Sequence, residues 1–392
     1  MKANLINYLK NNSIIYSFIA FLLRLFFNTV GLFCQTKKRI VFMSFGGRKF
    51  DDSPLALYNK IINDKFFDDY EIYWVFCKPN EYKLIRGKTI KVDSFKFFII
   101  LLTSKIWISN TMIDRGIGIR KKGVIRVETW HGTPLKKICG EENIKSFKTF
   151  KSKKTDNHTI RCAQSVYDQN IFARVFNSTK ESILLCDLPR NDELINNISA
   201  EKRDEILTKI GAPLNKKIIL YIPTYREYLK TKRYENYIAP PINLRVWEEK
   251  LGCNFILLFR AHYAVNKVLG IKNNGFVFDV STYDRLNDLF QICDILISDY
   301  SSAFFDFSIK ERPMFCFAYD LEEYSEKRGL YLDIEKDLFL KVFRTENNLL
   351  DQLMDNPNSI AAKRIKKKYA PNAGNACSTI ISEIKKRLLC KK

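Results

Sequence analysis

The chain has 392 residues, of which 46% are hydrophobic and 14% aromatic. This length exceeds one typical hydrophobic core and predicts two domains, and the apolar content excludes a wholly disordered chain. The formal net charge of +22 predicts an anionic partner, such as a membrane surface, a phosphorylated substrate or nucleic acid. A lysine-rich, solvated surface is the alternative explanation of the charge.

The ten cysteines form neither a zinc motif nor a disulfide framework. No two of them make a CxxC pair, and most lie within apolar runs. This usage predicts buried thiols in a reducing cytosol.

The N-terminal segment, residues 1–36, is predicted to associate with a membrane. Residues 14–33 are almost entirely apolar and long enough to span a bilayer, but Arg24 at their centre is costly in hydrocarbon. No clear cleavage site follows, so a removed signal peptide is not favoured. We favour a helix lying in the membrane interface over a spanning helix or a buried core helix. The cations expected to face anionic headgroups are Lys2, Lys10, Arg24, Lys37, Lys38 and Arg39.

From residue 38 onward, short β-type runs alternate with helical stretches, which predicts βαβ units and mostly parallel sheets. In the first half we expect strands at 40–45, 71–77, 89–92, 106–110, 124–129 and 183–186, and helices at 55–62, 95–103 and 167–176. In the second half we expect strands at 217–222, 254–259, 276–280, 295–298 and 313–319, and helices at 201–210, 244–251, 284–293, from 301 and at 375–389. A polar stretch at 196–204 predicts domains at 37–200 and 201–392.

Two of the three histidines follow predicted strands. His131 comes after the strand at 124–129 and His262 after the strand at 254–259, whereas His158 lies in a polar region and is assigned to the surface. The carboxyl ends of strands line the ligand cleft of open α/β sheets, and histidine is the usual general base near neutral pH. We interpret His131 as a candidate base, with a hydrogen-bonded loop histidine as the alternative.

Other strand ends carry groups suited to a diphosphate. The run Ile295–Ser298 leads into hydroxyls at a predicted helix start, where an anion is favoured, although ordinary capping explains the same residues. Arginine binds phosphate with two parallel hydrogen bonds. The donor-side candidates are therefore Thr224, Arg226, Arg260, Asp299, Ser301 and Ser302. No carboxylate cluster suited to a metal is evident, so no tightly bound metal is expected.

Two further turns have open interpretations. Gly46-Gly47, followed by Asp51-Asp52, is interpreted either as part of an acceptor site or as a tight bend. The run Pro189-Arg190-Asn191-Asp192 has the composition of an ordinary turn.

Together the motifs resemble the CDP-glycerol glycerophosphotransferase family of teichoic-acid and capsule enzymes, over roughly residues 40–388. The resemblance is carried, in chain order, by the signature Thr129-Trp130-His131-Gly132-Thr133-Pro134-Leu135-Lys136-Lys137, by residues 189–192, 223–226 and 298–306, and by Arg312-Pro313, residues 319–324 and residues 328–331. The turn at residues 372–376 departs from the Asp-Gly pair that is frequent in the family. A long additional N-terminal domain of the kind found in some polymerases is absent, so the chain resembles shorter members, which include priming enzymes.

The resemblance implies a GT-B-like fold, with two Rossmann-like domains facing a cleft and a membrane-associating N-terminal helix. It implies transfer of a polyol phosphate from CDP-glycerol or CDP-ribitol, a substrate and not a cofactor, to a lipid-linked glycan or polymer, with release of CMP. Peripheral attachment to the cytoplasmic face of the membrane is expected. By this analogy His131 and His262 are catalytic, and the residues on the acceptor side or in a structural role are Gly132, Thr133, Lys136 and Arg190.

Two other functions remain open at this stage. A GT-B glycosyltransferase that moves a sugar from a nucleotide donor to a lipid-linked acceptor would share the fold and the diphosphate site. Binding of nucleic acid is disfavoured, because the basic residues are spread along the chain without an aromatic platform.

Overall fold

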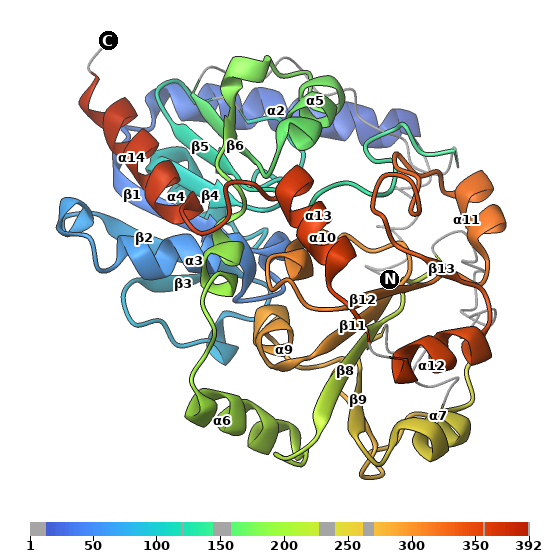
Figure 1. The fold of residues 1–392 in the computed structure, drawn as a ribbon. Helices are drawn as coiled ribbons and strands as arrows, with labels where there is room; N and C mark the ends of the chain where they lie inside the picture. The colour runs from blue at the N-terminus through green and yellow to red at the C-terminus, as the bar shows by residue number, and fades with distance from the viewer. Residues whose placement is uncertain are drawn as a thin grey trace. The chain divides into compact units, whose positions relative to one another are not determined.

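The computed structural model describes residues 13–119, 121–143, 158–226, 240–261, 270–355 and 357–390. It is an α/β protein with two parallel sheets (Figure 1). By packing, the chain divides into unit 1, residues 1–131, 156–161 and 380–392, and unit 2, residues 132–155 and 162–379. This division differs from the predicted boundary near Glu201, because unit 2 already begins at Gly132, directly after His131.

Within the described residues, seven strands form the first sheet, in the order β3-β2-β1-β4-β5-β6-β7. Ile40 lies beside Ile72 and Ile106 in parallel register. The predicted strands are confirmed, but β6 was missed because it follows a polar, lysine-rich stretch. The strands are β1 (Lys37–Met43), β2 (Glu71–Phe76), β3 (Lys88–Lys91), β4 (Ser104–Ser109), β5 (Ile125–Glu128), β6 (Thr159–Ala163) and β7 (Ile183–Leu185).

The helices of this part begin where the sequence offers caps and apolar faces. The Ser94 hydroxyl accepts a hydrogen bond from Phe97 N at 3.1 Å and starts α4, whose side chains then pack on the sheet. The helices are α2 (Ser13–Phe33), α3 (Asp52–Ile61), α4 (Phe95–Thr103), α5 (Val166–Val175) and α14 (Ala376–Leu389). The 3₁₀ turns are η1 (Phe45–Gly47), η2 (Lys65–Phe67), η3 (Pro79–Glu81), η4 (Lys180–Ser182) and η5 (Pro189–Leu194).

Helix α2 packs on unit 1 by one side and exposes large apolar side chains on the other. Phe27 is buried and stacks on Phe98 of α4 at a centroid distance of 4.3 Å. The outward side carries Phe18, Phe21, Leu22, Leu25, Phe26, Leu32 and Phe33, each at least 46% exposed. In the described part of the chain, no helix has the length and apolarity needed to cross a bilayer.

The predicted headgroup-facing cations are mostly bound to protein groups, which corrects that expectation. Arg24 donates to the carbonyl of Ile117 at 2.9 Å, so its charge is turned toward unit 1. Lys38 pairs with Asp69, and Arg39 pairs with Glu71 at 3.2 Å. Lys37 is exposed, as expected, whereas Lys2 and Lys10 lie outside the described residues.

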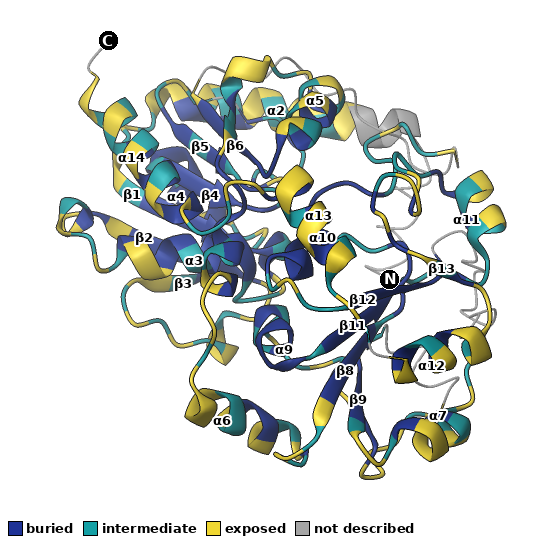
Figure 2. Ribbon diagram, viewed as in Figure 1, coloured by how far each residue is buried: buried dark blue, intermediate teal, exposed yellow. Residues whose placement is uncertain are grey.

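The second sheet belongs to unit 2 and comprises six strands of the described chain, in the order β10-β9-β8-β11-β12-β13. Alternate residues of one strand enter two separate cores, because successive side chains point to opposite faces: Ile218 and Leu220 face one core, Ile219 and Tyr221 the other. Figure 2 shows the buried strands and the exposed outer faces of the covering helices. The strands are β8 (Lys217–Ile222), β9 (Phe255–Phe259), β10 (Val277–Asp279), β11 (Ile295–Ser298), β12 (Met314–Phe317) and β13 (Val342–Phe343).

Helices on both faces cover this sheet. Trp247 and Leu251 of α7 pack in one core together with α12, whereas α6, α9, α10 and α13 pack in the other. Asp192 caps α14, since its carboxylate oxygens accept from Ala376 N and Cys377 N, each at 2.8 Å. The helices are α6 (Ala200–Ile210), α7 (Leu244–Leu251), α9 (Leu286–Ile292), α10 (Ala303–Ser308), α11 (Leu321–Lys327), α12 (Glu346–Met354) and α13 (Ile360–Tyr369).

Candidate active site

His131 lies just past strand β5, at the end of the first segment of unit 1. Its Nδ1 is 3.1 Å from the carbonyl oxygen of Asn110, which follows β4. The ring stacks on Trp130 at a centroid distance of 4.1 Å and lies 6.3 Å from the ring of Phe45. Because β4 and β5 are parallel neighbours, their carboxyl ends bring these groups together. We call Phe45, Asn110, Trp130 and His131 the histidine cluster.

The carbonyl of Asn110 sets the tautomer of the His131 ring. A carbonyl oxygen can only accept, so Nδ1 carries the proton in this hydrogen bond. In the neutral ring Nε2 then holds the lone pair, and Nε2 is the nitrogen that can take a proton from a hydroxyl. Asn110 was not among the predicted site residues, although it ends a predicted strand just as His131 follows one.

The next residue, Gly132, belongs to unit 2 and approaches two of its side chains closely. Gly132 has φ +143°, and a Cβ there would lie 2.7 Å from Ser302 Oγ and 3.5 Å from Arg190 Nη2. Only glycine adopts this backbone conformation without strain and leaves room for both neighbours. The structure therefore brings together three sequence-predicted residues, Gly132, Arg190 and Ser302.

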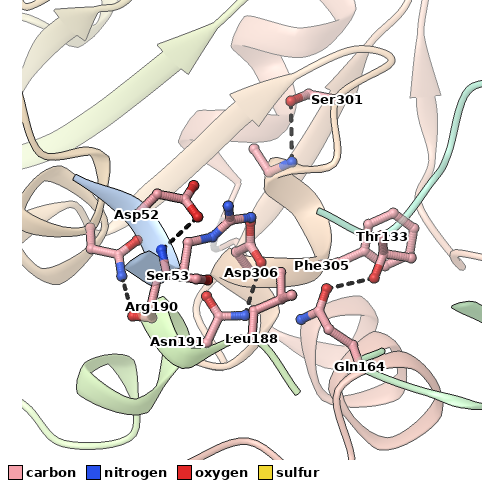
Figure 3. Close-up of polar contacts among 12 residues, drawn as sticks. Asp52, Ser53, Thr133, Gln164, Leu188, Arg190, Asn191, Ser301, Phe305 and Asp306 are labelled. Atoms are coloured by element: carbon pink, nitrogen blue, oxygen red, sulfur yellow. Dashed lines mark hydrogen bonds and ion pairs between the residues drawn. The ribbon is translucent and has the colours of Figure 1, made fainter. Parts of the chain in front are cut away.

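Thr133 is held by a buried network rich in acidic groups. Thr133 Oγ1 lies 2.6 Å from Gln164 Oε1 (Figure 3). It also lies 3.0 Å from Asp168 Oδ2. Gln164 Nε2 donates to Asp187 Oδ1 at 3.0 Å. Burial raises the pKa of Asp168 to about 8 and the pKa of Asp187 to about 6. Asp168 is therefore a neutral carboxylic acid near pH 7, which limits the negative charge of the network.

The same network fixes Arg190. Asn191 Nδ2 donates to Asp187 Oδ1 at 3.1 Å and to Asp306 Oδ1 at 2.9 Å. Arg190 Nη2 forms a largely buried ion pair with Asp306 Oδ2 at 2.7 Å (Figure 3). The run 189–192 has the composition of an ordinary turn, but it links the signature, residues 129–137, to helix α10.

The residues after strand β11, Asp299–Ser302, form what we call the serine turn. Ser301 Oγ accepts from Ala303 N at 3.1 Å at the start of α10, whereas Ser302, the N-cap residue, makes no side-chain capping hydrogen bond. Ser302 Oγ lies beside Gly132, as described above. Asp299 is fully buried and binds protein groups. The donor-phosphate role of this turn stays a prediction.

Arg226 is buried between two carboxylates. Its Nη1 lies 2.8 Å from Asp299 Oδ2, and its Nε and Nη2 lie 2.7 and 2.8 Å from the two oxygens of Asp320. Nη1 also donates to the carbonyl of Thr224 at 2.6 Å, and Thr224 N donates to Asp299 at 2.8 Å. The guanidinium therefore joins the loops after β8, β11 and β12, and its predicted role as a diphosphate ligand is not tested.

The remaining candidates have mixed outcomes. Arg260 Nη1 donates to the carbonyls of Val280 at 2.9 Å and Tyr283 at 2.6 Å, so it supports the loop after β10. Lys136 forms an isolated antiparallel bridge with Leu330. His262 lies outside the described residues. In the part of the chain that the structure describes, no three His, Cys, Asp or Glu residues are grouped to hold a metal; the expectation of no tightly bound metal stays a prediction.

Substitution of Gly132 tests how closely the signature loop must pack. We expect Gly132→Ala to strain the backbone by about 1–3 kcal/mol and to lower catalytic turnover about tenfold or more, because its Cβ would meet Ser302 Oγ at 2.7 Å. Gly211→Ala is the matched control, since Gly211 also has positive φ (+78°) but a Cβ placed there would have nothing within 4 Å. The control should lose about 1 kcal/mol of unfolding free energy and keep its turnover. Wild-type turnover in Gly132→Ala would contradict this expectation.

Similarity to known proteins identifies the family of the chain. Residues 25–379 match the family described as CDP-Glycerol:Poly(glycerophosphate) glycerophosphotransferase. The chain belongs to this family. This family member is 31% identical over 330 residues to the teichoic acid glycerol-phosphate transferase of Staphylococcus aureus, which covers 81% of this chain and 83% of the relative. It is 32% identical over 314 residues to the teichoic acid poly(glycerol phosphate) polymerase of Staphylococcus epidermidis, which covers 77% of this chain but only 43% of the relative.

Solved structures show the same fold. The wall teichoic acid polymerase TagF superposes with a TM-score of 0.77 and 29% identity, covering 90% of this chain and 89% of that chain. A TagF variant soaked with CDPG gives a TM-score of 0.77 and 28% identity, with 90% and 91% coverage. The α/β architecture with parallel sheets is therefore shared with TagF.

Proposed function

We propose that this family member transfers glycerol phosphate, or a related polyol phosphate, from CDP-glycerol to a hydroxyl of a membrane- or lipid-linked acceptor in teichoic-acid or capsular polymer synthesis. The observation that carries the proposal is the tautomer of His131 within the family signature: Asn110 holds Nδ1, so Nε2 has the lone pair. His131 is bonded to Gly132, which packs on Ser302. The family description, which names CDP-glycerol, supports the choice of donor, and the names of the relatives support glycerol phosphate as the transferred group.

The reaction is an in-line displacement at phosphorus. The acceptor oxygen forms a bond to the polyol-bearing phosphorus, and the bond from that phosphorus to the oxygen of CMP breaks, so that the electron pair leaves with CMP. Nε2 of His131 takes the proton of the acceptor hydroxyl. Positioning and electrostatic stabilisation dominate such transfers, because little covalent chemistry is left to the protein.

Donor binding is assigned to unit 2. Ser301 and Ser302 would contact the diphosphate at the carboxyl end of β11. Arg190 pairs with Asp306 of the following helix and is assigned to the acceptor side or a structural role. Thr224, Arg226, Arg260 and Asp299 would shape the donor site, largely through the contacts that fix its loops. His262 is proposed to share this side by family resemblance, and no metal or other cofactor is proposed.

A product assay tests this function. The protein is incubated with a lipid-linked acceptor analogue and, in parallel, with CDP-glycerol, CDP-ribitol or a UDP-sugar, and product mass and CMP release are measured. CMP release with one added polyol phosphate indicates a single transfer, and a ladder indicates polymerisation. Consumption of the UDP-sugar alone would contradict the proposal and favour a glycosyltransferase.

We also propose peripheral attachment to the cytoplasmic face of the membrane through the outward side of α2, within a GT-B-like arrangement. Phe21 and Leu25 are 55% and 56% exposed, so burying the exposed part of each in lipid would contribute roughly half of the ~1.5–3 kcal/mol of full burial. Replacing both by serine should weaken binding to phosphatidylglycerol-containing vesicles by tenfold or more, since about 1.4 kcal/mol is tenfold. Ile85→Ser, at another highly exposed apolar residue, is the control. Equal binding of the double variant and the wild type would contradict attachment through α2.

A further inference from the structure

Two guanidinium groups of unit 1 meet at the end of strand β1. A Cβ placed on Gly46 would lie 3.2 Å from Arg115 Nη1 and 3.8 Å from Arg48 Nη1. Gly46 is glycine with φ +66°, so no side chain fills the space that both groups approach. Both arginines are exposed. We call Arg48 and Arg115 the arginine pair.

The protein neutralises only part of the charge of the arginine pair. Arg115 donates through Nε to Asp93 at 2.9 Å, which leaves its terminal Nη1 directed at Gly46. Within the described residues, the Arg48 side chain forms no ion pair. Two guanidinium groups and one carboxylate leave one net positive charge at this point. Like charges that converge at the surface favour an anion between them.

The arginine pair shares its supports with the histidine cluster. Asn110 Oδ1 accepts from Phe45 N at 2.8 Å, while the Asn110 carbonyl binds His131. The next residue, Thr111, accepts from Gly46 N through Oγ1 at 3.1 Å. Phe45 itself has φ +47°, a strained conformation for a non-glycine residue that is typical of functional sites. Consecutive residues after β4 therefore hold both the proposed base and the turn where the arginines meet.

We propose that the arginine pair binds a phosphate group of the acceptor and so presents the neighbouring acceptor hydroxyl to His131. This inference rests on the proposed function. Guanidinium groups match the geometry of phosphate oxygens and form charge-assisted hydrogen bonds with them. The family description names poly(glycerophosphate), in which the terminal hydroxyl lies on a glycerol unit that carries a phosphodiester. The sequence leaves the Gly46-Gly47 turn open as either part of an acceptor site or a tight bend. The proposal assigns a phosphate ligand to the arginine pair beside it.

A binding experiment tests the pair without requiring catalysis. Glycerol 3-phosphate is titrated calorimetrically into the full chain, into Arg48→Ala and into Arg115→Ala, with uncharged glycerol as the ligand control. We expect each variant to bind glycerol 3-phosphate about tenfold more weakly or worse, because a charge-assisted hydrogen bond is lost. Lys60→Ala removes an exposed positive charge elsewhere in unit 1 and should bind as the wild type does. Unchanged binding by both arginine variants, or equal binding of glycerol, would overturn the proposal.

Two further measurements separate this proposal from the function on which it rests. Inorganic phosphate should compete with glycerol 3-phosphate; a failure to compete would show that the phosphate group is not what the pair recognises. In the transfer assay, Arg48→Ala should raise the KM for the acceptor more than the KM for CDP-glycerol, and the reverse order would place the pair on the donor side. If the wild type transfers nothing from CDP-glycerol, the proposed function fails, while the binding results still decide the role of the arginines.

Discussion

Replacing His131 by alanine is expected to lower the rate of transfer about a hundred- to ten-thousandfold, the usual range for loss of a general base. Asn110 holds Nδ1 of the ring at 3.1 Å, so the substitution removes the Nε2 lone pair that takes the proton. The measurement is CMP release from CDP-glycerol in the presence of acceptor, with circular dichroism to verify the fold.

Two controls isolate the chemical role of the ring. His131→Gln keeps a donor able to reach the Asn110 carbonyl but has no basic nitrogen, so it should be about as slow as His131→Ala. His158→Ala removes an exposed histidine and should keep the wild-type rate. A fast His131→Gln variant would mean that the ring only supports the loop.

Arg226→Ala is expected to lower the free energy of unfolding by about 3–5 kcal/mol, because it leaves the buried carboxylates of Asp299 and Asp320 without their cation. Arg226→Lys should lose less, since it keeps the charge but cannot bind both carboxylates with the same planar geometry. Denaturant unfolding monitored by fluorescence measures the effect.

A surface ion pair serves as the control for the Arg226 variant, and the effect on the KM for CDP-glycerol distinguishes a structural role of Arg226 from ligand binding. Arg344 pairs with Glu322 at the surface, where both side chains are about half exposed or more, so Arg344→Ala should change the unfolding free energy by about 0–1 kcal/mol. If Arg226 served mainly as a diphosphate ligand, Arg226→Ala would raise the KM for CDP-glycerol and leave the unfolding free energy unchanged. That pattern would contradict a structural role for the buried pairs.

The resemblance drawn from the motifs is confirmed by the family match over residues 25–379. Local structure was also largely predictable, because period-2 and period-3.6 patterns follow directly from side-chain geometry. Helix α4 and strands β8 and β11 have the predicted bounds. Strand β6 was missed because it carries Thr159 and Arg161 and so lacks the apolar run by which strands are recognised. Strand β13 and helices α11, α12 and α13 were not predicted either.

The sequence predicted which residues follow strand ends and could belong to the site, but not which residues they contact. The rule that ligands bind at the carboxyl ends of parallel strands singled out His131 and the serine turn from the sequence. It also selected Arg226 as a phosphate ligand, but could not reveal Asp320, which lies 94 residues away and binds the guanidinium with both oxygens. Free arginines and paired arginines look alike in a sequence, because the partner is set by packing.

By itself, the sequence determined the family, most of the strands, and the signature that contains His131. The tertiary structure alone decided the protonation and pairing of those groups: the tautomer of His131 through Asn110, and the neutral state of Asp168 through burial. It likewise decided that Arg48 and Arg115 meet at Gly46. The physical reason is that hydrogen bonds, desolvation and charge act between atoms a few ångströms apart, and residues far apart in the chain reach that separation only when the sheets have formed.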